Sequence, residues 1–468
     1  MPFDRSRSTG IALLPYLLGL LLCLGPACAS DEDAATESSA PILLIGVDGL
    51  EWRVLAEMMQ DGQLPTLRRL MEEGSFGKLQ TLTPTWSPVI WTTIATGKIA
   101  HKHGIMDFTK IVDGERRLYS NRDRRTKALW NIFTDYHRIV HSVGWWMTFP
   151  AEAIDGTMVA QTNTMEQLRQ QHGRGIWKGT LVRGLPGQVT PETFHDRVMD
   201  IGVDVQGNLP ELSRQAFGEF PHPLDGLAAH DWENGLWAFR ADTIYSRVAA
   251  EILSEGGQPF DLLMVYFGSP DVVGHRFWRY AYPEEFSHPP STSDQENFSR
   301  VIRDAYAYVD KTIGQLLEAV DGEPTVFIVS DHGMHAANQD KEFPPRRELY
   351  SGDHGDAPPG VLIAAGRHIR QAPITFTDIK SLNDLPTLGR VLDVATTILA
   401  LKTLPLGRDM DGVVLEDLLE ESFLERHPVA YVETHDTREW LTSRPEELLS
   451  PEAEQERLEQ LRSLGYLQ

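Results

Sequence analysis

The sequence predicts an α/β fold: a three-layer sandwich in which a central, mostly parallel sheet is covered by helices on both faces and carries a cap or insertion. Continuous apolar runs that end abruptly at polar residues are typical of buried parallel strands, and helical segments separate these runs. The 468 residues are 41% hydrophobic and 24% charged, an ordinary globular composition that permits a large core. We therefore expect one dominant domain.

Three long apolar runs define the predicted sheet. They cover residues 41–47, 261–267 and 325–330. Two shorter strands are expected at residues 138–145 and 360–365. Each run is too short for a buried helix and is bounded by glycine or polar residues, which favours strands.

Five segments between these strands have the composition and apolar spacing of helices. They are residues 65–73, 88–96, 242–255, 298–320 and 386–401. Buried strands that alternate with helices imply a sheet covered on both faces.

The main domain is expected to span residues 41–425. Within it, residues 160–235 carry many Gly, Pro, His and aromatic residues without clear periodicity, which indicates a cap or insertion. Residues 426–468 then form a C-terminal extension. In this extension Glu452–Leu464 has leucines at helical spacing and is expected to dock as a terminal helix.

The N-terminus has the features of an export signal. Arg5 and Arg7 precede an apolar run, and residues 27–29 read Ala-Cys-Ala, which fits a cleavage site. We expect residues 1–29 to be a signal peptide. Residues 30–40 are small, polar and acidic, as in a flexible spacer. The protein is therefore expected to be exported, to the periplasm or the extracellular space.

Cys28 leaves two alternatives to simple cleavage open. It could be the lipid-modified first residue of a bacterial lipoprotein, anchored to the membrane, although residues 25–27 match the usual motif poorly. A retained anchor is less favoured, because Pro15 and Gly19 interrupt a run that is short for a membrane span. The other cysteine, Cys23, also lies in the leader, so metal ligands of the mature chain must be carboxylates, imidazoles and hydroxyls.

The charge balance excludes one class of partner. Lys and Arg number 43 against 67 Asp and Glu, which gives a formal charge of −24. Because a phosphate backbone would be repelled, no binding to a nucleic-acid duplex is expected. An anionic substrate would need local positive charge, such as bound metal ions.

Acidic and imidazole side chains gather where the predicted strands end. The carboxyl ends of parallel strands meet at one edge of an α/β sheet, where ligands bind. Each residue alone could be a cap, a turn residue or a structural histidine. Together they suit two metals, and mixed carboxylate and imidazole ligands suit zinc. The six residues are Asp48, Asp271, His275, Asp331, His332 and His354.

Ser87 begins the predicted helix at residues 88–96, with Pro88 at its first position. A purely structural role as a helix cap is the simpler interpretation. A helix N-terminus also binds phosphate oxygens, and a serine beside a metal ion can become a nucleophile. Ser87 is therefore also a candidate for in-line attack on a phosphate ester.

At this point the motifs resemble those of the alkaline phosphatase superfamily, and within it the type I phosphodiesterase and nucleotide pyrophosphatase family. The resemblance covers most of the mature chain, and the ordered set of motifs is more specific than any one of them. The motifs are Gly46-Val47-Asp48-Gly49, Ser87-Pro88, Thr96-Gly97, His103-Gly104-Ile105, Asp271-Val272-Val273-Gly274-His275, Ser330-Asp331-His332-Gly333-Met334, His354, Leu385-Pro386-Thr387 and residues 406–412.

The resemblance implies a role for each candidate residue. One zinc would be bound by Asp271, His275 and His354, and the other by Asp48, Asp331 and His332. Another divalent metal such as Mn²⁺ could serve instead. Ser87 corresponds to the nucleophile, which also binds metal and carries a covalent intermediate that water hydrolyses. Residues 41–425 would be the catalytic domain, acting on a small phosphate ester.

The chain also departs from the family pattern. Eukaryotic members generally have a Thr nucleophile followed by Phe-Pro-Asn-His, and an Asn soon after His-Gly-Ile, where this chain has Ser87-Pro88 and Asp107-Phe108. A backbone N–H near Pro88, or Lys98, is expected to bind the phosphate oxygen instead. Residues 87–91 do not fit the sulfatase motif, and the leader argues against a cytoplasmic phosphoglycerate mutase.

Several other features have a structural interpretation as the simpler one. A basic cluster could bind a substrate anion but is expected to be a solvated loop. Trp145, Trp146 and Trp278 could stack on a substrate, yet core packing is favoured. His101 and His103 are expected to be structural. The basic cluster comprises Arg116, Arg117, Arg122, Arg124, Arg125 and Lys127.

The sequence thus predicts an exported two-metal hydrolase of phosphate esters that works through Ser87. Two alternatives remain: a transferase that moves a phospho-headgroup onto an alcohol at the same site, and a catalytically inactive envelope metal-binding protein. Preference for monoesters or diesters, the natural substrate and the oligomeric state do not follow from the sequence.

Overall fold

The computed structural model of the chain describes the residues from 40 to 442 apart from several internal gaps. The described residues are 40–112, 114–161, 186–254, 259–343, 350–356, 358–372, 379 and 381–442. The predicted signal peptide, all of the spacer except Ala40, and the predicted terminal helix at Glu452–Leu464 lie outside this range and remain predictions.

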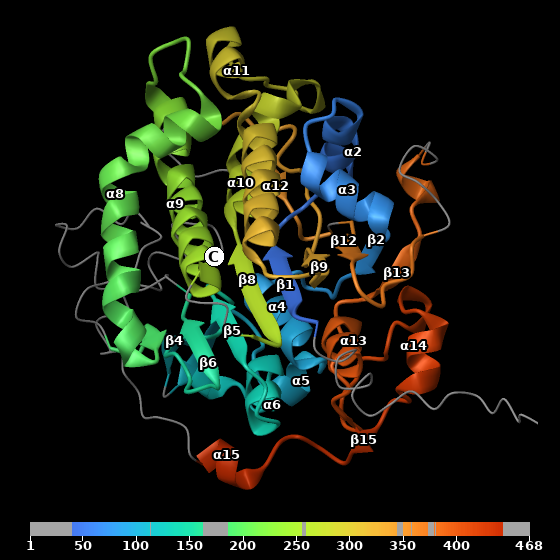
Figure 1. Cartoon of the computed structure of the whole chain (residues 1–468). Coiled ribbons are helices and arrows are strands. Elements are labelled where there is room, and N and C mark those ends of the chain that lie inside the picture. The colour runs from blue at the N-terminus through green and yellow to red at the C-terminus, as the bar shows by residue number, and fades with distance from the viewer. Residues whose placement is uncertain are drawn as a thin grey trace, which may run out of the picture. The chain divides into compact units, whose positions relative to one another are not determined.

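Nine strands form one sheet in the order β13-β2-β12-β9-β1-β8-β5-β6-β7 (Figure 1). β1 pairs in parallel with β8 and β9, β5 with β8 and β6, and β13 with β2. β12 runs antiparallel to β2 and β9, and β7 runs antiparallel to β6. The sheet strands are β1 (Ile42–Val47), β2 (Ser75–Gln80), β5 (Val140–Val143), β6 (Gly156–Val159), β7 (Val189–Thr190), β8 (Leu262–Phe267), β9 (Thr325–Val329), β12 (Gly360–Ala365) and β13 (Thr387–Arg390).

The three central strands are the three predicted apolar runs. Every residue of β1, β8 and β9 is buried, as expected for parallel strands covered on both faces. The shorter strands predicted at residues 138–145 and 360–365 are β5 and β12. Three two-stranded ladders lie outside the main sheet: β3 (Thr109–Val112) with β4 (Glu115–Leu118), β10 (His335–Ala336) with β11 (Gly352–Asp353), and β14 (Leu406–Gly407) with β15 (Tyr431–Val432).

Helices pack on this sheet in two groups. In the first, α3 contacts β12 and α12, and α12 contacts α9, which lies between β8 and α8 (Figure 1). In the second, α4 contacts α5 and α13, and α6 contacts β5. The predicted α/β architecture, a mostly parallel central sheet packed with helices, is confirmed.

The helix bounds follow the chain order. The α-helices are α2 (Trp52–Gln60), α3 (Pro65–Glu73), α4 (Ser87–Thr96), α5 (Ala100–His103), α6 (Leu129–Asp135), α8 (His195–Phe217), α9 (Gly226–Ser254), α10 (Ser269–Ala281), α11 (Thr292–Phe298), α12 (Val301–Ala319), α13 (Asp393–Leu401), α14 (Glu421–Arg426) and α15 (Arg438–Thr442). Short 3-10 turns occur at Asn121–Asp123, Glu192–Phe194, Pro283–Glu285, Leu382–Asp384 and Glu416–Leu418.

The prediction of one helix over residues 386–401 is wrong in its first part. Thr387–Arg390 is the edge strand β13, and only Asp393–Leu401 is helical. The backbone N–H of Lys78 on β2 donates to the carbonyl of Pro386 at 2.8 Å. Backbone groups of β2 thus form hydrogen bonds with this segment. Because of this pairing, the segment is a strand despite its helical composition.

Residues 160–235 contain more regular structure than their composition suggested. They include the 23-residue helix α8 and the start of α9, which begins 16 residues before the predicted position 242. Val198, Val205 and Leu209 face the core at helical spacing. Gly202 and Gly207, together with a proline inside the helix, hide this pattern in the sequence.

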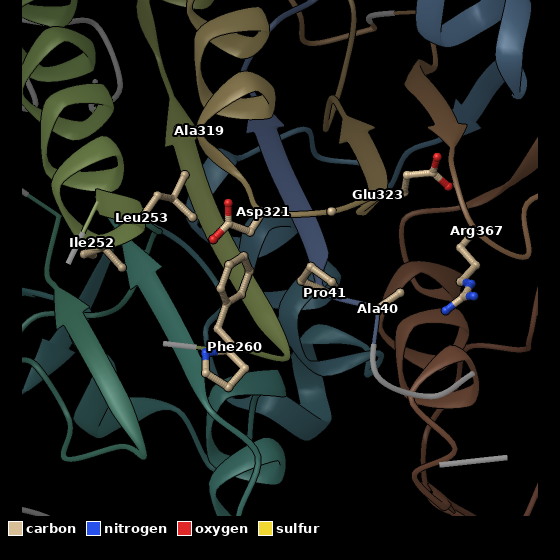
Figure 2. A pocket seen from close by; sticks show the side chains of 11 residues that line it. Ala40, Pro41, Ile252, Leu253, Phe260, Ala319, Asp321, Glu323 and Arg367 are labelled. Atoms are coloured by element: carbon tan, nitrogen blue, oxygen red, sulfur yellow. The ribbon is translucent and has the colours of Figure 1, made fainter. Parts of the chain in front are cut away.

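A cavity of about 520 Å³ lies at the amino ends of the central strands (Figure 2). It is lined by Pro41, which directly precedes β1, and by Phe260, which comes two residues before β8. Asp321 lines it from the loop before β9. This is the edge of the sheet opposite to the one where the predicted site residues follow the strands. Within the described part of the chain, no helix combines the length and apolar character needed to cross a bilayer.

Gly46 on β1 allows helix α4 to approach the sheet closely. A Cβ at this position would lie 2.6 Å from Cζ3 of Trp91 and 3.1 Å from Cζ3 of Trp145.

We expect Gly46→Ala to destabilise the fold by about 1–3 kcal/mol, because two packed indoles would have to move. Urea unfolding measures this change. Gly207→Ala on α8 is the control, since its Cβ would meet nothing within 4 Å. The control should be neutral or stabilising by about 0.5–1 kcal/mol. Equal stability of the two variants would contradict the close packing.

Candidate active site

Three carboxylates meet at the carboxyl ends of three adjacent strands. β9, β1 and β8 are neighbours in the sheet. Asp48 directly follows β1, Asp331 comes two residues after β9, and Asp271 lies in the first turn of α10 just after β8. All three are buried, with at most 2% of their surface exposed. The strand order therefore brings together side chains that are far apart in the sequence.

The structure forms two groups of potential metal ligands that share one histidine. Ligand atoms of Asp48, Asp331 and His332 lie within 4.8 Å of one another, as do those of Asp271, His332 and His354. Nε2 of His332 is 3.3 Å from Oδ1 of Asp48 and 3.4 Å from Oδ2 of Asp331. The first group contains the same three residues as one predicted zinc site.

The second group differs from the predicted zinc site in one histidine. His332 takes the place expected for His275 in the group with Asp271 and His354. His275 is nevertheless close, because its Nε2 lies 3.3 Å from Oδ1 of Asp271, and Nε2 of His354 lies 3.9 Å from the same oxygen. The rings of His332 and His354 stack with centroids 3.9 Å apart. All six predicted ligand residues thus come together, and their division between two ions stays a prediction.

Each of the three histidines is oriented through Nδ1. Nδ1 of His275 lies 2.8 Å from the carbonyl oxygen of Gly352. Nδ1 of His332 lies 3.0 Å from the carbonyl oxygen of Gly333. A carbonyl oxygen only accepts hydrogen bonds, so Nδ1 carries the proton and Nε2 keeps its lone pair. Metal-binding histidines typically donate their other ring N–H in this way.

His354 follows the same rule through a hydroxyl group. Its Nδ1 lies 3.0 Å from Oγ1 of Thr85, whose own proton is donated to the carbonyl oxygen of His354. The hydroxyl therefore accepts the Nδ1 proton. His335, which was not among the predicted ligands, repeats the pattern, with Nδ1 3.0 Å from the carbonyl oxygen of Ala336.

The electrostatics of the cluster favour a cation. Oδ1 of Asp48, both carboxylate oxygens of Asp331 and Nε2 of His332 are buried and have no hydrogen-bond partner among the described residues. Burial raises the pKa of Asp48 and Asp331, and the neighbouring carboxylates raise it further. Burial and repulsion from the other imidazoles hold the pKa of His354 well below its usual value. Buried oxygen and nitrogen atoms that have no hydrogen-bond partner among the described residues are suited to bind a divalent metal ion.

Asp271 is the exception among the three carboxylates. Burial opposes its ionisation, but the attraction and hydrogen bond of the His275 imidazole, together with the attraction of His354 and His332, hold the pKa of Asp271 below its usual range. The same pair acts on the histidine. Burial lowers the pKa of His275, but the attraction and hydrogen bond of Asp271, together with the hydrogen bond to the Gly352 carbonyl, make the net shift upward.

Ser87 is buried at the start of α4, with 1% of its surface exposed and no hydrogen-bond partner for Oγ among the described residues. The prediction that it caps the helix is wrong. Trp86 is the residue before the first helical turn, and Ser87 occupies the first helical position. Its hydroxyl is therefore not used by the helix, which is unusual for a buried serine.

The first turn of α4 offers few donors to a phosphate group. Pro88 has no N–H, and the N–H groups of Val89 and Ile90 both donate to the carbonyl of Trp86, at 2.9 and 3.0 Å. The expectation that a backbone N–H near Pro88 binds a phosphate oxygen gains no support from these contacts. Positive charge for a substrate must come from elsewhere.

Lys98 lies in an ion-pair network at the end of α4. Its Nζ is 2.6 Å from Oδ2 of Asp409 and 2.7 Å from Oδ2 of Asp436, and its side chain is 4% exposed. The buried ammonium group is thus paired with two partly exposed carboxylates, which gives this cation a structural role. The prediction that Lys98 binds substrate stays untested, and these contacts do not favour it.

The basic cluster is not simply a solvated loop. Arg124 is buried and its guanidinium lies 2.5 Å from Glu152, while Nζ of Lys127 lies 2.5 Å from Asp135. Both cations are buried and paired, although the Asp135 carboxylate is itself exposed. The side chains of Arg116 and Arg117 lie outside the described part of the structure.

The aromatic residues near the site belong to the core, as favoured from the sequence. Trp145, Trp146 and Trp278 are 0%, 6% and 2% exposed. His103 is buried, with Nε2 3.1 Å from Oγ1 of Thr93 and Nδ1 accepting the N–H of Ile105. Burial, followed by repulsion from Arg124, lowers the pKa of His103 to about 3.

Several residues that support the site were missed at the sequence level. Asp242 on α9 accepts the N–H groups of Gly268 and Ser269, both at 2.8 Å, and thereby fixes the turn that leads to Asp271. Burial raises the pKa of Asp242 to about 7. Tyr266 donates to Oδ2 of Asp48 at 2.7 Å. No local motif announces contacts between residues so far apart in the chain.

The comparison with known families agrees with this cluster. A model of the family described as type I phosphodiesterase / nucleotide pyrophosphatase matches residues 42–356. The chain belongs to this family. The match includes every predicted ligand and Ser87, and it confirms the resemblance on which their roles were based.

Individual relatives are distant. Ectonucleotide pyrophosphatase/phosphodiesterase family member 7 of Rattus norvegicus is 23% identical over 332 residues, which cover 69% of this chain and 56% of the relative. The chain thus spans about half the length of this relative. A 2,3-bisphosphoglycerate-independent phosphoglycerate mutase of Synechococcus sp. (strain JA-3-3Ab) is 28% identical over 170 residues, covering 36% of this chain and 26% of the mutase.

Among solved structures, the chain was matched to human ectonucleotide pyrophosphatase/phosphodiesterase 5. It shares 12% sequence identity and has a TM-score of 0.47. The alignment covers 81% of this chain and 100% of that one.

Metal binding should stabilise this family member. Without a cation, three buried carboxylates are held close together and oppose folding. After chelation we expect a lower thermal midpoint, which Zn²⁺ restores in a concentration-dependent way. A metal concentration about 100 times the Kd adds about 2.7 kcal/mol. Calorimetry of the chelated and reloaded protein measures the shift. Asp331→Ala should respond less, and a midpoint of the native chain that ignores metal would contradict the assignment.

His103 should make the fold sensitive to acid. The pKa of His103 is about 3 in the folded chain, against an ordinary value of 6.5 that applies to the unfolded chain. The stabilisation is therefore complete above pH 6.5 and is lost as the pH falls toward 3. By pH 4.5 the loss is about 2–3 kcal/mol.

We expect His103→Gln to show a correspondingly smaller difference between urea unfolding at pH 7 and at pH 4.5. The exposed His101→Gln serves as the control and should follow the native chain. If His103→Gln and the native chain have the same pH dependence, the burial of a neutral imidazole is not the cause.

Proposed function

We propose that this chain is an exported two-metal hydrolase that cleaves phosphate esters of the phosphodiester or nucleotide pyrophosphate type through Ser87. One observation carries the proposal. Ser87 is buried, its hydroxyl has no hydrogen-bond partner among the described residues, and it begins α4. Trp91 of this helix contacts one group of potential metal ligands at Asp48, and Thr85, two residues before Ser87, contacts the other group at His354. Membership of the type I phosphodiesterase / nucleotide pyrophosphatase family supports the same reaction class.

The reaction proceeds in two displacements. Oγ of Ser87 attacks phosphorus, so that an Oγ–P bond forms while the bond to the leaving oxygen breaks. The serine proton leaves with the departing alcohol. Water then attacks phosphorus, the Oγ–P bond breaks and Ser87 regains a proton. The buried position of Ser87 keeps other nucleophiles away from the intermediate.

Six residues hold the metal ions in this proposal. Asp48, Asp331 and His332 would bind one ion, and Asp271, His275 and His354 the other. We propose Zn²⁺, with Mn²⁺ as another candidate, because the donors are carboxylate oxygens and imidazole nitrogens. When bound, two such ions supply Lewis acidity that lowers the pKa of the serine hydroxyl and offsets phosphate charge.

The substrate is a small phosphate ester with two substituents on phosphorus. The names of the relatives, which describe ectonucleotide pyrophosphatases and phosphodiesterases, support this class. The structural roles of Lys98, Arg124 and Lys127 also support it, because each of these cations is already paired with a carboxylate. A diester carries one charge fewer than a monoester and needs less neutralisation.

Export is part of the proposal. Residues 1–29 would be removed as a signal peptide, or Cys28 would carry a lipid anchor. Cell fractionation distinguishes these outcomes when the native chain is compared with Cys28→Ala. Release of the variant from the membrane fraction would indicate lipidation, and cytoplasmic retention of the native chain would exclude export.

Ser87→Ala tests the mechanism. We expect loss of turnover by at least about 1,000-fold, because no other group can form the intermediate. Metal content should stay close to two ions, since the six Asp and His ligands are unchanged. The assay compares an aryl phosphate monoester, a diester, a nucleotide and a sulfate ester on zinc-loaded protein.

Ser142→Ala is the matched control for this test. Ser142 is also fully buried, and its hydroxyl has no hydrogen-bond partner among the described residues, but it lies on β5 and not on α4. It should keep native turnover. Unchanged turnover in Ser87→Ala would remove Ser87 from the mechanism, and activity on the sulfate ester alone would replace the proposed substrate class.

A further inference from the structure

The segment that carries Ser87 is attached to the metal-ligand groups at two points. Thr85, two residues before Ser87, contacts His354, and Trp91, four residues after it, contacts Asp48. Asp48 belongs to one group of potential ligands and His354 to the other. The nucleophile is therefore bracketed by contacts to both groups.

The first contact uses a single hydroxyl twice. Oγ1 of Thr85 donates to the backbone carbonyl of His354 and accepts from Nδ1 of its ring at 3.0 Å. Thr85 is 3% exposed, so water does not compete for these bonds. Both the backbone position and the ring orientation of His354 thus depend on this threonine.

The second contact acts on one carboxylate oxygen. Nε1 of Trp91 donates to Oδ2 of Asp48 at 3.0 Å, and Tyr266 donates to the same oxygen at 2.7 Å. Oδ1 is consequently turned toward His332, whose Nε2 lies 3.3 Å away. One oxygen is fixed by the protein, and the other is left for the cluster.

Trp91 itself has no freedom to move. Its ring packs edge-on against Trp145 and Tyr266, with centroids 5.1 and 5.3 Å apart. It is fully buried, and its ring lies against the space left by Gly46. The donor of Asp48 is therefore fixed to the sheet as well as to the nucleophile helix α4.

We propose that Thr85 and Trp91 are positioning residues that tie the Ser87 turn to one ligand of each metal group. The two metal positions and the nucleophile are then held in one rigid arrangement. The inference rests on the proposed function for its catalytic meaning. Its structural claim is that each residue controls a different ion.

The experiment measures metal binding directly. Metal-free native chain and variants are titrated with Zn²⁺ in competition with a chromophoric chelator, which resolves two binding steps. Thr85→Val, which keeps the shape of threonine, should weaken one step by about 10-fold or more, in the range found for residues that orient metal ligands. Trp91→Phe should weaken the other step by a similar factor. Thr85→Ser should restore native binding.

Controls separate this role from general destabilisation. Thr92→Val removes a buried hydroxyl from the same helix, one that donates to the carbonyl of Pro88 and contacts no ligand. It should leave both binding steps unchanged. Tyr266→Phe removes the other donor to Oδ2 of Asp48 and should weaken the same step as Trp91→Phe. Circular dichroism of the metal-free variants checks their folding.

The outcomes separate the inference from the proposed function. Native metal affinity in folded Thr85→Val overturns the inference, whatever the result for Trp91→Phe. Weakening of the same single step by both variants also overturns it. If Ser87→Ala keeps full turnover while the two variants weaken different steps, the proposed function fails. The positioning roles of Thr85 and Trp91 are then still supported. In active protein, the variants should lower kcat more than they change KM.

Discussion

The crowding of three buried carboxylates is the constraint on which the rest of this structure depends. Asp48, Asp271 and Asp331 follow neighbouring strands, so the pairing of β9, β1 and β8 forces them together. Oδ1 of Asp48 and both carboxylate oxygens of Asp331 have no hydrogen-bond partner among the described residues. The imidazoles, the indole of Trp91 and the phenol of Tyr266 are best understood as a shell that orients these acids for a compensating cation.

The sequence revealed the carboxylates because each stands where an apolar run ends. Such runs become adjacent parallel strands, so a shared edge could be predicted without knowing the strand order. The grouping of the histidines could not be predicted in this way. His354 reaches the cluster through the short ladder of β10 and β11, in which His335 pairs with Asp353, and nothing local in the sequence announces that ladder. The strand at Thr387–Arg390 was missed for the same reason, because its partner lies elsewhere.

Several cations of this acidic chain suggested a site for an anionic substrate, but their contacts in the fold do not support one. Lys98, Arg124 and Lys127 all follow helix α4 in the sequence and suggested an anion site. In the fold each is paired with a carboxylate. Lys98 in particular joins the end of α4 to the C-terminal residues Asp409 and Asp436. The charge of Lys98, which seems available for a substrate, is used in these two ion pairs.

The shared position of His332 limits how the two groups can be filled. Nε2 of an imidazole has a single lone pair, so it can coordinate only one ion at a time. Whichever ion takes it, the other group is reduced to a pair of side chains unless a further donor joins. Nε2 of His275 lies 3.3 Å from Oδ1 of Asp271 and is placed to supply that further donor. The valence of one nitrogen atom is thus consistent with the predicted partition, in which His332 binds an ion together with Asp48 and Asp331.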